Sequence, residues 1–185
     1  MRFRLPVAAV AFSAAVAVAG LGLGISSASA SAAPSRFVPA CTAGDLGVWV
    51  AIDQGNGTAG SVYYPLQFTN LGGHACTLHG FPGVSAISGS GHQLGSPAGW
   101  GHVSVPRTVV LAAGATAHTE LRWTDVTVFP ASSCRPTSAA VELRVYPPNQ
   151  RSSTDAEFGL EACSHAGPVY LSVGPIIPGV GTING

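Results

Sequence analysis

The chain contains no lysine, so its eight basic residues are all arginines. Arg2 and Arg4 precede an apolar run, and the other six arginines are scattered over the rest of the sequence. A protein that binds nucleic acid clusters Lys and Arg on one surface to neutralise phosphates. The sequence therefore argues against a nucleic-acid partner. The lack of lysine also excludes the S-x-x-K motif of some serine nucleophiles.

Charged residues are scarce as well, at 9% of the chain, and a single apolar run approaches the length of a membrane span. This run, residues 5–25, follows the N-terminal arginines and leads to an A-x-A site at 28–30. That order is typical of a secretory signal peptide. A retained membrane anchor fits less well, because the run is rich in Gly and Ala and contains Pro6. We predict that residues 1–30 are a signal peptide, that the chain is secreted, and that no membrane span is left after cleavage.

Cleavage would leave 185 − 30 = 155 residues, enough for one domain, with a formal charge of 6 − 8 = −2 from six arginines and eight acids. All four cysteines lie in this part, and in an exported chain such cysteines form disulfides. Four cysteines allow three pairings. We favour Cys41–Cys76 and Cys134–Cys163, because each pair brackets a local group of predicted strands.

Alternation of apolar and polar residues with a period of two predicts a succession of strands. The clearest strand has its apolar face at Val62, Tyr64, Leu66 and Phe68. Pro65 lies within it, so we expect this strand at a sheet edge or with a bulge at the proline. The residues predicted to point into the core are Val62, Tyr64, Leu66, Phe68, Leu121, Trp123, Val141, Leu143, Val145, Leu160, Val169, Leu171 and Val173.

Turns rich in Gly and Pro separate these strands, and no segment after the signal peptide has the pattern of an amphipathic helix. About seven to nine short strands predict an all-β fold, an immunoglobulin-like two-sheet β-sandwich held by two disulfides. A closed barrel is the alternative. We assign residues 31–40 to a flexible lead-in and 41–176 to the sandwich. Residues 177–185 form a C-terminal tail that is loose or packs as an extended strap.

The sequence carries no convincing motif for catalysis. Residues 55–60 match the G-x-G-x-x-G dinucleotide fingerprint in letters only, because they lead into a strand and not a helix. The six histidines show neither H-x-H nor H-E-x-x-H spacing, and no G-x-S-x-G elbow occurs. We therefore predict no catalytic residue, no cofactor and no metal ligand.

The aromatic residues give the one indication of binding. Trp100 lies in the run Gly99-Trp100-Gly101-His102, which predicts a loop. An exposed indole stacks on a sugar or anchors a protein partner. The alternative is that Trp100 folds back over the end of the sandwich. We take Trp100 and His102 as the candidate binding residues, and expect Trp49 and Trp123 to be packing residues within strands.

One segment carries a resemblance to a known family. Residues 68–84 read FTNLGGHACTLHGFPGV, and residues 41–46 read CTAGDL. These runs resemble the actinobacterial secreted domain of unknown function numbered 4232, whose pattern is an N-x-G segment followed by Cys-Thr-Leu-x-Gly-Tyr/Phe-Pro-Gly-Val. Phe81 stands where tyrosine is commoner. The resemblance covers about 41–176 and implies an exported protein or lipoprotein, with no assigned activity and no catalytic residues.

The sequence as a whole favours a secreted, non-enzymatic β-sandwich domain that binds an extracellular or cell-envelope partner. The alternative is a secreted hydrolase or a metal-handling protein. Loops at the ends of a sandwich are the usual place of recognition in such domains.

Overall fold

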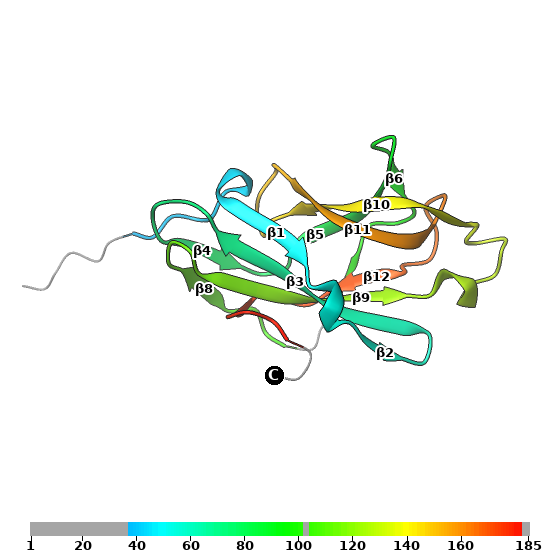
Figure 1. Cartoon of the computed structure of the whole chain (residues 1–185), viewed down its shortest axis with the longest axis horizontal. Helices are drawn as coiled ribbons and strands as arrows, with labels where there is room; N and C mark the ends of the chain where they lie inside the picture. The colour runs from blue at the N-terminus through cyan, green and yellow to red at the C-terminus, as the bar shows by residue number, and fades with distance from the viewer. Residues whose placement is uncertain (1–36, 102–103, 183–185) are drawn as a thin grey trace, which may run out of the picture. The chain divides into compact units, whose positions relative to one another are not determined.

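The computed structural model describes residues 37–101 and 104–182, which fold mainly as β-strands (Figure 1). The predicted signal peptide, most of the lead-in, His102 and the last three residues lie outside these ranges. Helix in the described part is limited to three 3₁₀ turns, η1 (Ala43–Asp45), η2 (Ile52–Gln54) and η3 (Val126–Val128). No helix within these ranges has the length and apolarity to cross a membrane.

The strands form two main sheets and a small third one. The seven-stranded sheet has the order β1 (Leu46–Val50), β3 (Ser61–Asn70), β9 (Thr116–Thr124), β12 (Leu171–Val173), β7 (Gly99–Trp100), with β2 (Asn56–Thr58) beside β3 and β13 (Ile177–Pro178) beside β9. The four-stranded sheet has the order β11 (Thr154–Cys163), β10 (Pro136–Tyr146), β5 (Gly83–Ser88), β6 (Gln93–Leu94). The third sheet pairs β4 (Cys76–His79) with β8 (Thr108–Leu111).

The two main sheets pack face to face, with β10, β11 and β5 in one layer and β3, β9 and β12 in the other (Figure 1). Tyr64 of β3 meets Phe158 of β11 across the interface, with ring centroids 5.0 Å apart in an edge-to-face arrangement. The predicted all-β class and its sandwich arrangement are confirmed. The immunoglobulin-like pattern stays a prediction.

Most of the predicted core residues are confirmed. Eight of them are buried: Leu66, Phe68, Leu121, Leu143, Val145, Leu160, Leu171 and Val173. Tyr64 and Trp123 are partly buried and pack against this core, and Val62 is half-buried. Alternation therefore identifies the inner face wherever a strand keeps a regular register.

Two core predictions are wrong. Val141 is 49% exposed, because the register of β10 against β5 shifts between Ala140 and Glu142. This bulge turns Val141 outward and puts Ala140, which is buried, in its place. Val169 is 53% exposed, because β12 begins only at Leu171.

The expectation that Pro65 marks a sheet edge or a bulge is also wrong. β3 lies inside the sheet, between β9 and the pair β1 and β2, and its register with β9 is regular. The Pro65 carbonyl accepts from the Ala51 N–H at 3.0 Å, beyond the end of β1. Since the N–H and C=O of one strand residue point to the same side, the donor that proline lacks would face the gap between β1 and β2. The sheet therefore loses no ladder bond there.

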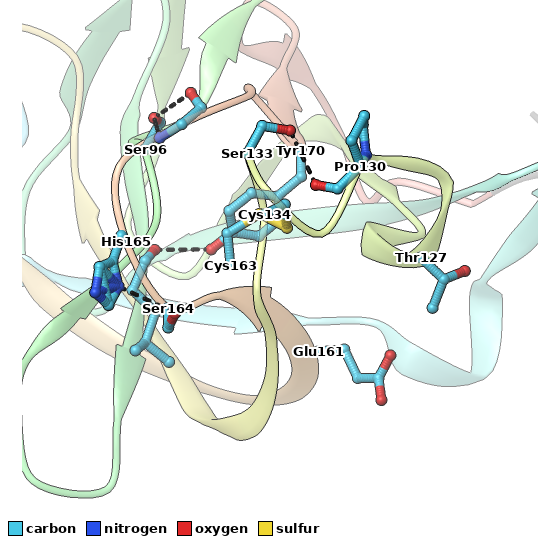
Figure 2. The surroundings of a disulfide bond; sticks show 12 residues. Ser96, Thr127, Pro130, Ser133, Cys134, Glu161, Cys163, Ser164, His165 and Tyr170 are labelled. Atoms are coloured by element: carbon cyan, nitrogen blue, oxygen red, sulfur yellow. Dashed lines mark hydrogen bonds between the residues drawn. A yellow bond between two sulfur atoms is a disulfide. The ribbon is translucent and has the colours of Figure 1, made fainter.

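Both predicted disulfides are confirmed, Cys41–Cys76 with 35 residues of separation and Cys134–Cys163 with 29. The first fixes the N-terminal segment to β4, where Cys41 N–H also donates to the Thr77 carbonyl. The second closes the open end of the β10–β11 hairpin (Figure 2). Two disulfides are typical of an oxidising environment outside the cytoplasm.

The C-terminal tail is expected to be either loose or packed as an extended strap. Residues 177–182 pack as an extended strap. β13 pairs with β9, and the His118 Nδ1 donates to the Gly179 carbonyl at 2.9 Å. Gly181 exchanges two hydrogen bonds with the Gln67 side chain, which is fully buried beneath it. A Cβ at Gly181 would come within 2.5 Å of the His118 ring, so this close approach requires glycine.

We expect Tyr170→Phe to lower the free energy of unfolding by about 1–3 kcal/mol, as measured by urea denaturation. The Tyr170 ring is buried, burial raises the pKa of its phenol, and its hydroxyl donates to the Leu94 carbonyl at 2.8 Å. Phenylalanine keeps the ring and leaves that carbonyl without this donor. Tyr63→Phe, at a half-buried tyrosine, is the matched control and should change stability by less than about 0.5 kcal/mol. Equal effects of the two variants would refute the role of this hydrogen bond.

Candidate functional site

Trp100 lies on β7, a two-residue strand at one edge of the seven-stranded sheet. β7 runs parallel to β12 and pairs Trp100 with Val173. Paired residues on neighbouring strands point to the same face of a sheet, so Trp100 lies on the face of the core residue Val173. Its side chain is nevertheless 61% exposed, because no strand continues the sheet beyond β7 in the described chain.

The Trp100 indole stacks on Phe81, with ring centroids 5.3 Å apart and an angle of 14° between the planes. Phe81 lies in the turn between β4 and β5. Gly80, with φ of 107°, allows that turn, and its carbonyl accepts from the Ile176 N–H at 2.9 Å. We call the two rings the aromatic step.

Backbone hydrogen bonds fix the strand that carries Trp100. The Ala98 N–H donates to the Val84 carbonyl at 2.8 Å, and the Gly101 N–H donates to the Val173 carbonyl at 2.9 Å. The indole is therefore presented by a backbone anchored on both sides and is supported underneath by Phe81. His102, the second predicted binding residue, lies outside the described residues.

The other two tryptophans differ from each other. Trp123 is partly buried, and its Nε1 donates to the Glu161 carbonyl at 3.0 Å, which links the two main sheets. It is the packing residue that the sequence predicts. That prediction is wrong for Trp49, which is 46% exposed. Leu46 and Val50 fill the inner face of β1, so the alternation of this strand turns Trp49 outward.

Two of the described histidines lie beside serine hydroxyls. His92 lies 3.1 Å from the Ser90 hydroxyl, and His165 lies 3.0 Å from the Ser164 hydroxyl. Neither of these pairs hydrogen-bonds a carboxylate within the described chain, as a nucleophilic serine would need. Nor do the residues of the two described ranges place three or more His, Cys, Asp or Glu side chains where they could hold one metal ion.

A family model for a domain of unknown function, DUF4232, matches residues 41–176. The chain belongs to this family. No curated protein and no solved structure was found to match the chain. The run at residues 76–84, which carries the resemblance noted in the sequence, forms β4, the turn with Phe81 and the start of β5. Within it Cys76 makes a disulfide and Val84 enters the core, so the run builds the corner that supports Trp100.

Proposed function

We propose that this chain is a secreted, non-enzymatic domain that binds a partner at the cell envelope of an actinobacterium. Its signal peptide, residues 1–30, would direct export and be removed. The two disulfides support a place of work outside the cytoplasm. The resemblance to the exported members of its family supports the same location.

The aromatic step is the proposed contact surface. The observation that carries this proposal is that Trp100 remains 61% exposed while Phe81 stacks beneath it. A large ring held in one orientation loses little conformational entropy on binding, and interfaces concentrate their energy in such residues. In the predicted alternative, Trp100 only covers the edge of the core.

We expect Trp100→Ala to weaken partner binding about thirtyfold, which corresponds to about 2 kcal/mol. The measurement is recovery of the partner from the envelope fraction of the producing organism on immobilised domain, followed by titration. Leu71→Ala removes another large exposed apolar side chain, from the loop after β3, and should leave recovery unchanged.

The unfolding temperature of each variant separates the two roles of Trp100. Loss of recovery with an unchanged unfolding temperature supports the proposed binding surface. A lower unfolding temperature with unchanged recovery would show that Trp100 only caps the sandwich, and would overturn the proposal.

A further inference from the structure

A groove of about 1040 Å³ lies at the side of the sandwich opposite the aromatic step. It follows β1 and β11, which contact each other and are edge strands of the two main sheets. β7, which carries Trp100, is the other edge of the seven-stranded sheet. We call this surface the edge groove and define it by Trp49, Ile52, Val141, Glu142, Asp155 and Glu157.

Large apolar side chains line part of the edge groove. Trp49, Ile52 and Val141 are all about half exposed or more. Each reaches the surface for a structural reason: Trp49 by the alternation of β1, Ile52 in the turn η2, and Val141 at the bulge of β10. These three exposed side chains offer apolar surface that a partner could bury.

Carboxylates line the other part. Glu142 of β10 lies directly opposite Glu157 of β11 in the antiparallel register. Like charges in directly opposed positions destabilise a sheet. The neighbouring pair, Arg144 and Asp155, forms an ion pair at 3.2 Å, and the hydrogen bond to Asp155 raises the pKa of the Arg144 guanidinium. Arg144 is therefore already paired with Asp155. Glu142 and Glu157 face each other, and neither forms a salt bridge within the described chain.

The two strands are also edges of their sheets. β1 pairs only with β3, and β11 pairs only with β10, within the described residues. An edge strand can take up an extended peptide through its free N–H and C=O groups. Alternate side chains of such a peptide point to opposite sides, so basic residues would meet the carboxylates while apolar residues meet Trp49 and Ile52.

We propose that the edge groove binds an extended segment of a partner protein in which Arg or Lys residues alternate with apolar residues. The charge of the groove favours a cationic segment over an anionic one, and its apolar side favours a peptide over a free cation. This inference does not depend on Trp100, because the two surfaces lie at opposite sheet edges.

The test is titration of the ¹⁵N-labelled chain with a peptide of about eight alternating Arg and Val residues, the length of an ordinary strand. The chain has three tryptophans, so binding can be followed at three indole N–H resonances, assigned with single Trp→Phe variants. We expect the Trp49 signal to move and the Trp100 signal to stay. A peptide of alternating Glu and Val is the matched control and should leave all three signals unchanged.

Variants of the groove test the charge. The double variant Glu142→Gln/Glu157→Gln should bind the Arg–Val peptide about tenfold more weakly. It should also unfold about 1–3 °C higher, since the facing charges are removed. Raising the salt concentration from about 50 to about 500 mM should weaken binding to the unchanged chain by a similar factor. Trp100→Ala should bind this peptide normally.

Three outcomes would overturn the proposal. One is no saturable shift of the Trp49 signal with the Arg–Val peptide. A second is equal affinity of the double variant, which would mean that the two glutamates do not contribute to peptide binding. The third is binding of a neutral oligosaccharide that needs Trp49 but neither glutamate nor low salt, which would make the groove a sugar site.

Discussion

Leu143→Ala is expected to lower the free energy of unfolding by about 2–5 kcal/mol, in the upper part of that range. Leu143 is fully buried on β10, in the middle of the four-stranded sheet. Its partners on the two flanking strands are Ala156 of β11 and Ala86 of β5. Since both neighbours are small, neither can extend into the space that the leucine side chain leaves, and a cavity remains.

Val141→Ala is the matched control, because it removes a branched apolar side chain from the same strand. Val141 is half exposed, so its replacement should change the free energy of unfolding by less than about 0.5 kcal/mol. Both values are measured by urea denaturation, with an unchanged dependence on denaturant as the sign of an unaltered fold. Similar values for the two variants would mean that β10 lacks the bulge at Val141.

The contrast between these two residues shows what sequence can predict here. Val141, Leu143 and Val145 have one spacing, and alternation alone assigns them to one face. The bulge that turns Val141 outward depends on the pairing of β10 with β5, about fifty residues earlier in the chain. Strand existence is a local property and was predictable, whereas register belongs to two strands at once.

The candidate sites show the same limit. The glycines on both sides of Trp100 predict a loop, whereas the structure places Trp100 on the two-residue strand β7, with its indole exposed. The support from Phe81 could not be predicted, because it joins a turn and an edge strand that are nineteen residues apart (100 − 81 = 19). The exposure of Trp49 could have been predicted from the sequence, because Leu46, Val48 and Val50 alternate with it on β1. Its place beside Glu142 and Glu157 depends on the packing of the two sheets.

Removal of the Cys134–Cys163 disulfide, by replacing both cysteines with alanine, is expected to cost about 2–5 kcal/mol of stability. Part of that cost comes from the unfolded chain, in which a loop with 29 residues of separation is no longer closed. The other part comes from packing, since both cysteines are buried. A Cβ built at Gly95 would lie 2.5 Å from a ring atom of Tyr170 and 3.3 Å from the Cβ of Cys163, so these three residues are close-packed.

This packing gives the disulfide a second, sharper test. Figure 2 shows the Tyr170 ring beside the two cysteines, and the Tyr170 hydroxyl reaches the Leu94 carbonyl. If the bridge holds Tyr170 in place, then Tyr170→Phe should cost less in the variant without the bridge than in the unchanged chain. The measurement is a double-mutant cycle of unfolding free energies at fixed oxidising conditions. Removal of the Cys41–Cys76 bridge is the control, because it closes a loop of similar length on a different part of the chain and should combine additively with Tyr170→Phe. Additive losses in both cycles would show that the Cys134–Cys163 bridge does not position Tyr170.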